Sequence, residues 1–260
     1  MHGLCSDTNL THQYSSLFEE AGVAFSKGVL LYGPPGCSKT LTAKALATEG
    51  GYNFIPVKGP ELLNMYVGES ERAVRKVFER ARAASPSIIF FDEIDTIARR
   101  HQDNQHSGVH CLETLLNEMD GIESLRGVFV LAATNKPDVL DLRLLRPGRF
   151  ESIYVGPPDF AARVEILSAK VARMNVAKPF DINDLAHKMD GHSGAEIVDV
   201  CEKAWHQWLG EMLESGEEKK PMGLGYFHHA MKLVPKQISE AHKAEYENWK
   251  PGGGKVIRQW

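Results

Sequence analysis

The sequence feature that most constrains the fold is the segment Gly33–Thr40, which reads GPPGCSKT. An apolar run, residues 28–32, precedes it, and the helical run LTAKALATEG follows it. The segment nearly matches the phosphate-binding pattern G-x-x-x-x-G-K-[ST] in its required context between a strand and a helix. Such a loop directs backbone N–H groups and a helix N-terminus toward an anion. The alternative is a Gly-Pro turn before a helix, and the match to the pattern favours the phosphate-binding loop.

Three positions in this loop have separate expectations. Lys39 is expected to reach the β- and γ-phosphates of a nucleotide, and the Thr40 hydroxyl to ligate Mg²⁺. Ser38 stands where the generic pattern has glycine. If the backbone there has a positive φ, a side chain costs about 1–2 kcal/mol. The nucleotide-binding candidates in and beside the loop are Gly33, Pro34, Pro35, Gly36, Cys37, Ser38, Lys39, Thr40 and Leu41.

Short apolar segments alternate with helical patterns in the first part of the chain. Runs such as IIFF and VFVLAA suit strands that are buried on both faces, as in a parallel sheet. In residues 68–84, Val74, Val77, Phe78 and Ala81 recur at helical spacing. This alternation predicts a doubly wound α/β fold. The predicted strands are residues 27–33, 52–57, 87–92, 127–134 and 153–155.

The strand signal disappears after Asp159, and only helical patterns follow. Residues 193–196, SGAE, form a capping box that opens a long helix. The predicted helices of this part are residues 160–171, 181–189, 193–213, 225–234 and 235–249. We therefore expect an α/β domain over residues 1–158, a small all-helical lid domain over 159–250 and a flexible tail over 251–260.

Acidic and polar residues follow two of the predicted strands. Asp92 and Glu93 end the third strand, where one carboxylate can hold Mg²⁺ and its neighbour can polarise an attacking water. The alternative for these acids is helix capping, which the upstream phosphate loop makes the weaker interpretation. Asn135 follows the fourth strand, where its amide could orient that water or serve in a turn. Arg146 and Arg149 lie beyond it and could reach a γ-phosphate or be surface charges.

The overall charge and the cysteines limit the class of protein. A formal net charge of -4 offers no electrostatic basis for binding nucleic acid or an anionic membrane. No apolar run approaches the roughly 20 residues that span a bilayer. Four separated cysteines without a CxxC pair indicate a reducing compartment, so we expect a cytoplasmic protein, with the nucleus as the alternative. They are Cys5, Cys37, Cys111 and Cys201.

Taken together, GPPGCSKT, FFDEID, ATNKPD, LLRPGR and GHSGAE occur in the order and spacing of the AAA+ ATPases. The chain resembles the valosin-containing-protein class of this family, and most narrowly the second ATPase domain of its ATPase-family-gene-two branch. The resemblance implies a P-loop NTPase sheet with a helical lid that binds ATP and Mg²⁺. It assigns Lys39 and Thr40 to nucleotide and metal, Asp92 to the metal, Glu93 to catalysis and Asn135 to the first sensor. Gly194 and Ala195, which open a lid helix, match the family's contacts to adenosine.

The same resemblance implies an assembly and a task. Arg146 and Arg149 become arginine fingers that act on ATP bound by the neighbouring subunit of a homo-hexameric ring. Tyr66 falls in the family's first pore loop, which grips substrate polypeptide, although Met65, Tyr66 and Val67 could also simply cover the next helix. The branch acts in the maturation of large ribosomal subunit precursors, so protein substrates and pre-ribosomal particles are the expected partners, with no direct nucleic acid or membrane contact.

Some residues depart from the family pattern. Residues 1–16 do not match the family's lead-in to the phosphate loop, so the chain is expected to be a fragment, a truncated gene model or a divergent copy. The expected assembly is a homo-oligomeric ring, with a fragment of a two-ring chain as the alternative. Glu151 and Ser152 replace a common Asp-Arg pair. His101, His106 and His110 fit no zinc spacing and favour a polar loop. The alternative function is a truncated or regulatory nucleotide-binding subunit with negligible turnover alone.

Overall fold

The structure is a computed structural model that describes residues 27–63, 69–99, 106–121, 125, 127–215 and 220–250. It divides into two compact units. The first contains the described residues up to Gly33, then Lys39–Val155, and those from Tyr246 onward. The second contains Pro34–Ser38 and Gly156–Glu245. The predicted lead-in at 1–16, the tail at 251–260 and Tyr66 lie outside the described residues.

The first unit is built on a five-stranded sheet in which all strand pairs are parallel. The strand order is β2-β3-β4-β1-β5, so chain neighbours are joined by crossovers rather than hairpins. The strands are β1 (Gly28–Tyr32), β2 (Asn53–Lys58), β3 (Ser87–Asp92), β4 (Val128–Thr134) and β5 (Phe150–Tyr154). Every residue of β1 is buried, and so are five of the six residues of β3. The predicted doubly wound α/β fold is therefore confirmed.

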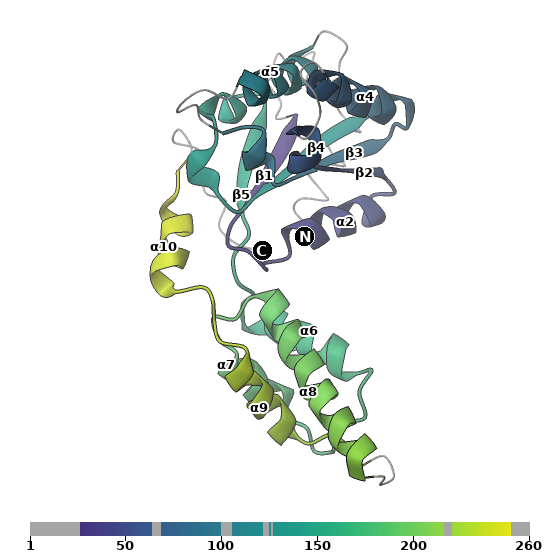
Figure 1. Cartoon of the computed structure of the whole chain (residues 1–260), viewed down its shortest axis with the longest axis vertical. Coiled ribbons are helices and arrows are strands. Elements are labelled where there is room, and N and C mark those ends of the chain that lie inside the picture. The colour runs from purple at the N-terminus through teal and green to yellow at the C-terminus, as the bar shows by residue number, and fades with distance from the viewer. Residues whose placement is uncertain are drawn as a thin grey trace. The chain divides into compact units, whose positions relative to one another are not determined.

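Helices cover both faces of this sheet (Figure 1). On one face lie α4 (Glu69–Ala83) and α5 (His106–Asp120), and on the other lies α2 (Lys39–Glu49). The predicted stripe of α4 is buried at Val74, Phe78 and Ala81. Shorter helical segments complete the unit: α3 (Gly59–Leu63) and the 3₁₀ turns η1 (Ile94–Thr96), η2 (Pro137–Val139) and η3 (Leu142–Leu145).

The second unit is helical and has a core of its own. Its helices are α6 (Phe160–Val171), α7 (Ile182–Lys188), α8 (Gly194–Ser215) and α9 (Leu224–Leu233), followed by α10 (Glu240–Asn248), in which the boundary between the units falls. Leu167, Leu185 and Phe227 are fully buried in this core. The capping box has formed: the Ser193 N–H donates to Glu196 Oε2 over 2.7 Å, and the Glu196 N–H donates to Ser193 Oγ over 3.3 Å.

Two elements differ from the pattern in the sequence. The last helix begins at Glu240 rather than at residue 235 because the preceding backbone bonds elsewhere. The Gln237 N–H donates to Glu196 Oε1 over 2.9 Å, and Ser239 Oγ accepts from the His242 N–H and caps α10. The fifth strand begins at Phe150 rather than at residue 153. Exposed Glu151 interrupts its apolar pattern, which hides the strand in the sequence.

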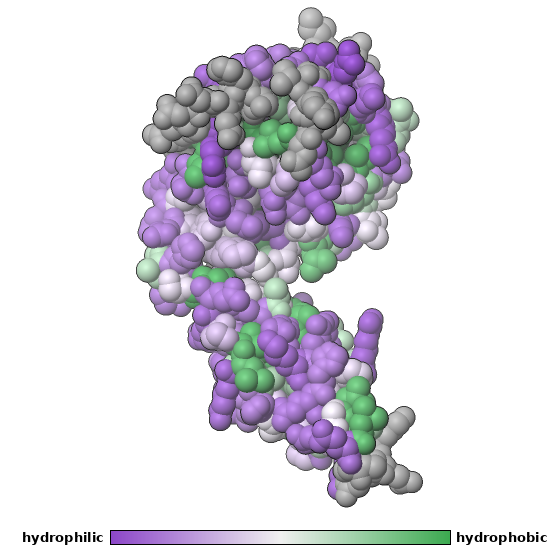
Figure 2. Space-filling model, viewed as in Figure 1, coloured by the Kyte–Doolittle hydropathy of each residue, from purple (hydrophilic) through white to green (hydrophobic). Residues whose placement is uncertain are grey.

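On the face shown in Figure 2, hydrophobic residues are scattered among hydrophilic ones rather than gathered in one broad patch. Among the described residues, no helix is both long enough and apolar enough to cross a membrane.

Candidate active site

The candidate residues of the first unit follow three neighbouring strands at the same edge of the sheet. Gly33 follows β1, Asp92 ends β3 and Asn135 follows β4. These strands are adjacent in the order β3-β4-β1, with Tyr32 opposite Thr134 in the register. Parallel strands bring their carboxyl ends to one edge, which is where open α/β sheets bind ligands.

The Lys39 side chain bonds to Gly33, the first residue of the phosphate loop. Its ammonium Nζ donates to the Gly33 carbonyl oxygen over 2.8 Å, and the residue is 7% exposed. Gly33 has a φ of 150°, and a Cβ there would lie 2.1 Å from the Val155 carbonyl oxygen. Only glycine therefore fits at this position. The contact places a buried cation against the loop that the sequence predicts to bind phosphate.

Thr40 and Asp92 are joined directly. The Thr40 hydroxyl, in the first turn of α2, donates to Asp92 Oδ2 over 2.9 Å. Hydroxyl and carboxylate oxygens are hard donors of the kind that Mg²⁺ prefers. The two residues that the sequence assigns to the metal are thus within hydrogen-bond distance of each other, and their chemistry fits that ion.

Glu93 adopts a left-handed backbone conformation, with φ 53° and ψ 47°. A positive φ is uncommon for a residue with a side chain and carries strain unless its surroundings hold it. Here its N–H donates to Asp92 Oδ1 over 3.1 Å, and its carbonyl oxygen accepts from the Thr96 hydroxyl over 2.8 Å. A Cβ on Gly59 would lie 2.4 Å from that carbonyl oxygen, so only a glycine at the start of α3 can approach the Glu93 backbone this closely. These contacts hold the turn that presents the exposed Glu93 side chain.

Ser38 has a positive φ of 65°, which is the backbone conformation in which, from the sequence, a side chain is expected to be costly. Ser38 belongs to the second unit, together with the rest of Pro34–Ser38, and within that unit Gly36 contacts the start of α8. The Ala195 N–H donates to the Gly36 carbonyl oxygen over 3.1 Å. A Cβ on Gly194 would lie 3.1 Å from Ser38 Oγ, so this glycine permits the close approach. The residues matched to adenosine binding thus lie against the phosphate loop.

Asn135 and the preceding Thr134 take part in hydrogen bonds that the sequence did not predict. Thr134 is buried, and its hydroxyl donates to Asp95 Oδ1 over 2.7 Å. The same hydroxyl oxygen accepts from the Lys136 N–H over 2.9 Å. The Asn135 carbonyl oxygen accepts from the Tyr246 hydroxyl over 2.6 Å. The end of β4 is therefore tied both to the turn that follows Asp92 and to the C-terminal helix.

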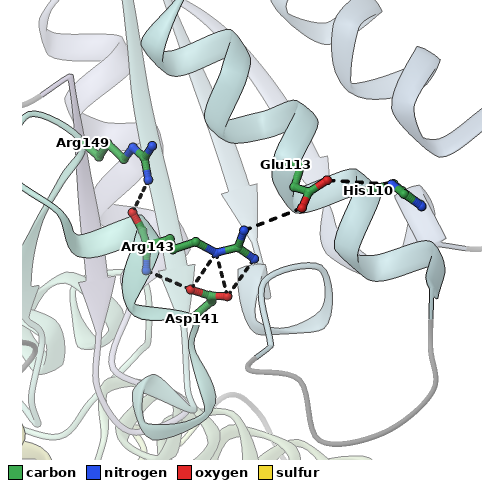
Figure 3. Close-up of polar contacts among 5 residues, drawn as sticks. All are labelled: His110, Glu113, Asp141, Arg143 and Arg149. Atoms are coloured by element: carbon green, nitrogen blue, oxygen red, sulfur yellow. Dashed lines mark hydrogen bonds and ion pairs between the residues drawn. The ribbon is translucent and has the colours of Figure 1, made fainter.

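Arg149 is engaged within its own unit. Its Nε donates to Asp120 Oδ1 over 3.1 Å at the end of α5, and its Nη1 donates to the Arg143 carbonyl oxygen. Arg143 in turn pairs with Asp141, with Nη2 and Oδ2 3.0 Å apart, and lies 3.7 Å from Glu113 (Figure 3). The hydrogen bond from Arg149, together with the charges of Arg149, Lys27 and Arg146, holds the pKa of the Asp120 carboxyl below its ordinary value, despite an opposing effect of burial.

Arg146 is exposed, and neither it nor Arg149 forms a hydrogen bond or ion pair with Lys39, Asp92 or Glu93 in the described part of the chain. The structure therefore joins Thr40 to Asp92, with Lys39 and Glu93 next to them in the chain, through a bond in which neither arginine takes part. Leu41 is 64% exposed, so its side chain has no packing role in the core. The described residues contain no cluster of three metal-ligating side chains, and His101 and the His106 side chain lie outside them.

Residues 29–157 match the family model described as the ATPase family associated with various cellular activities, AAA. The chain belongs to the AAA ATPases. The matched residues run from β1 through β5, so the AAA model covers the sheet and the turns that carry Lys39, Asp92 and Glu93.

The similar proteins agree with this assignment. The chain is 50% identical over 238 residues to the ATPase family gene 2 protein of Saccharomyces cerevisiae, and 47% identical over 241 residues to ATPase family gene 2 protein homolog A of Homo sapiens. These alignments cover 90% and 91% of this chain but 30% and 26% of the relatives. It is 43% identical to the Cell division cycle protein 48 homolog of Archaeoglobus fulgidus, over 90% of this chain and 34% of that protein. The AAA chain thus spans about a third or less of the length of these relatives.

Several residues of this AAA site carry no distinct signal in the sequence. Asp95 lies within FFDEID, three residues after Asp92, and nothing in this motif predicts its hydrogen bond with Thr134. Asp120 and Tyr246 are far from their partners along the chain, at separations of 29 and 111 residues. Only the fold brings these residues to their partners.

Proposed function

We propose that this chain binds ATP with Mg²⁺ and hydrolyses it to ADP and phosphate. The observation that carries the proposal is the hydrogen bond between the Thr40 hydroxyl and Asp92, with Glu93 held in the next position by the turn. It joins the phosphate loop to the acidic end of β3, and nucleoside triphosphatases need both parts within reach of one metal ion. Bound Mg²⁺ supplies charge neutralisation at the β- and γ-phosphates.

The chain's own residues divide the work as follows. Lys39 exchanges its bond to the Gly33 carbonyl oxygen for phosphate oxygens, and the backbone of the loop donates to the same anion. Thr40 and Asp92 supply oxygen ligands. Glu93 accepts the proton of the attacking water, and the Asn135 side chain orients that water. The exposure of Glu93 supports this role because water can reach its carboxylate.

We further propose that hydrolysis takes place at subunit interfaces of a homo-oligomeric ring. Arg146 and Arg149 would then stabilise charge on ATP bound by a neighbouring subunit. In the described part of the chain, Arg149 bonds to Asp120 and Arg143 rather than to Lys39 or Glu93, which supports action on another chain. The similarity to an ATPase family gene 2 protein and to a cell division cycle protein 48 homolog supports an ATPase activity. From the family resemblance of the sequence motifs, we propose protein remodelling as the task, with maturation of ribosomal precursors as the particular process.

Buried thiols support a reducing compartment. Cys111 and Cys201 are buried free cysteines in the described part of the chain. Burial raises the pKa of the Cys111 and Cys201 thiols to about 11, so both stay protonated and unreactive at neutral pH. This chemistry suits the proposed cytoplasmic or nuclear location.

A second function is supported by one specific contact. Arg149 is occupied by Asp120 of its own chain, so a finger would have to leave that partner or act while bound to it. A chain that keeps this pair closed would bind nucleotide and turn over negligibly, as a regulatory subunit.

Steady-state ATPase activity of the purified chain, measured over a wide range of chain concentrations, separates the two functions. The ring proposal predicts that the rate per chain rises with concentration, together with the assembled mass measured by light scattering. Thr40→Val keeps the shape of the side chain, removes the oxygen ligand and should abolish the activity. Thr48→Val is the matched control, since Thr48 lies exposed on the same helix and its hydroxyl donates only to the Lys44 carbonyl. A low rate at every concentration, with nucleotide bound, would favour the regulatory subunit.

A further inference from the structure

The C-terminal helix contacts the ends of two adjacent strands of the sheet. The Tyr246 hydroxyl donates to the Asn135 carbonyl oxygen, directly after β4, over 2.6 Å. The Trp249 ring packs against the Tyr32 ring, the last residue of β1, with 4.5 Å between the ring centroids. Both contacts lie within the first unit. The helix thus reaches the points at which the phosphate loop and the Asn135 turn leave the sheet.

The spacing of the two aromatic residues matches the spacing of their partners. Tyr32 and Thr134 face each other in the register of β1 and β4. Tyr246 lies in α10, and Trp249 follows the last residue of that helix, with the Trp249 N–H donating to the Tyr246 carbonyl oxygen over 3.3 Å. The end of α10 and the residue after it therefore contact both strand ends, one through a hydrogen bond and one through ring packing.

Burial makes this contact specific. Tyr246 is 8% exposed, and Tyr32 is 1% exposed. A buried tyrosine hydroxyl needs a hydrogen-bond partner, and the Tyr246 hydroxyl donates to the backbone of the candidate sensor residue Asn135. The Asn135 carbonyl oxygen is fixed by this bond, and the Asn135 side chain extends from the same residue.

We propose that Tyr246 is a positioning residue for the ATPase reaction: its hydroxyl fixes the backbone at Asn135, and Trp249 fixes the matching end of β1. The proposal rests on the proposed ATPase function. In this proposal Tyr246 acts through the Asn135 backbone that its hydroxyl contacts, and it has no role of its own in binding the phosphates. Loss of the hydroxyl leaves the binding of the phosphates to Lys39 intact but lets the Asn135 amide move away from the position that orients water.

The test compares two Tyr→Phe variants. Tyr246→Phe keeps the ring and removes the hydroxyl. Tyr226→Phe is the matched control, because the Tyr226 hydroxyl also donates over 2.6 Å, to Glu211 Oε2 in the second unit. For each chain the measurements are kcat and KM for ATP, the Kd of a non-hydrolysed ATP analogue, and the thermal melting temperature.

We expect Tyr246→Phe to lower kcat by about fivefold or more, the factor that loss of one ordinary hydrogen bond allows, with the analogue Kd within about twofold of the unchanged chain. Tyr226→Phe should leave kcat unchanged. Three results would each overturn the proposal: an unchanged kcat in Tyr246→Phe, an equal loss in the control, or a loss of kcat that matches a loss of folded protein. If the unchanged chain itself shows no ATPase activity, the proposed function fails instead.

Amide hydrogen exchange gives a second readout that does not depend on turnover. We expect Tyr246→Phe to speed exchange in a peptide covering residues 128–136 and to leave β3, residues 87–92, unchanged. Equal acceleration in both peptides would indicate general destabilisation and would contradict the positioning role.

Discussion

Thr40 and Asp92 are 52 residues apart in the chain, and a hydrogen bond of 2.9 Å joins the Thr40 hydroxyl to the Asp92 carboxylate. The pair brings together the first turn of α2 and the last residue of β3. Both residues stay in place because their elements are packed on the same sheet: α2 buries Ala43 and Leu46 against it, and β3 lies within it. The site is therefore a consequence of the sheet topology.

Backbone strain at Ser38 predicts an unusual order of stabilities. Ser38→Gly and Ser38→Ala both remove the hydroxyl and differ only in the Cβ. Because φ is 65°, we expect the glycine variant to be more stable than the alanine variant by about 1 kcal/mol. At Ser168, inside α6, the same two substitutions should give the opposite order, with alanine more stable by about 1 kcal/mol.

Denaturant unfolding of these four variants measures both differences. An alanine variant at position 38 that equals or exceeds the glycine variant would show that the left-handed conformation is not maintained in solution.

Arg149 should act through the neighbouring subunit. We expect Arg149→Ala and Lys39→Ala each to be inactive alone, because one lacks the finger and the other lacks the phosphate contact. A finger given by a neighbour contributes roughly 10³–10⁵ in rate in related phosphoryl transfer. Mixed rings contain some interfaces with an intact loop and an intact finger, so ATPase activity should partly return. Absence of recovery in a mixture shown to co-assemble would instead place Arg149 in its own subunit's chemistry or in a structural role.

We expect the thermal stability of the folded chain to depend on pH through Asp120. The Arg149 hydrogen bonds lower its pKa in the folded chain, so the folded state favours the ionised carboxylate. Its stabilising contribution is present above the unfolded value of about 3.9 and is lost as the pH falls through the lower folded value. The melting temperature of Asp120→Asn should therefore lie below that of the unchanged chain at pH 7. The difference should shrink on acidification below about pH 4, and a difference that does not depend on pH would contradict the pairing.

We predict that Tyr66 contacts the protein substrate. As a pore-loop aromatic, it would grip polypeptide through apolar contact without a specific hydrogen-bond partner. Tyr66→Ala should keep nucleotide binding and most of the basal ATPase activity and should lose the unfolding or extraction of a protein substrate. Both activities and thermal melting are to be measured on one preparation. A large fall in melting temperature would assign Tyr66 to the packing of the next helix.

The strands and the phosphate loop could be predicted because their signals are local. The buried runs of β3 and β4 are continuous in the sequence, and GPPGCSKT has a required context between a strand and a helix. The segment before α10 could not be predicted, because its backbone bonds to Glu196, 41 residues away. The polar contacts of the site could not be predicted for the same reason, since they also join residues that are far apart in the chain.

The roles predicted for Asp92 and Thr40 rest on motif spacing, whereas the contacts Thr134–Asp95 and Tyr246–Asn135 need the three-dimensional register of β3, β4 and β1.

The central claim, that Glu93 activates water for ATP hydrolysis, is tested most directly by Glu93→Gln. The amide keeps the size of the side chain and lacks the basic carboxylate, so ATP binding should persist while kcat falls by about 10²–10⁴-fold. Glu165→Gln, an exposed acid on α6, is the matched control and should retain full activity. Nucleotide affinity and single-turnover hydrolysis are to be measured on the same preparations. Unchanged affinity with hydrolysis nearly abolished is the predicted result; hydrolysis at half the rate of the unchanged chain would contradict the account.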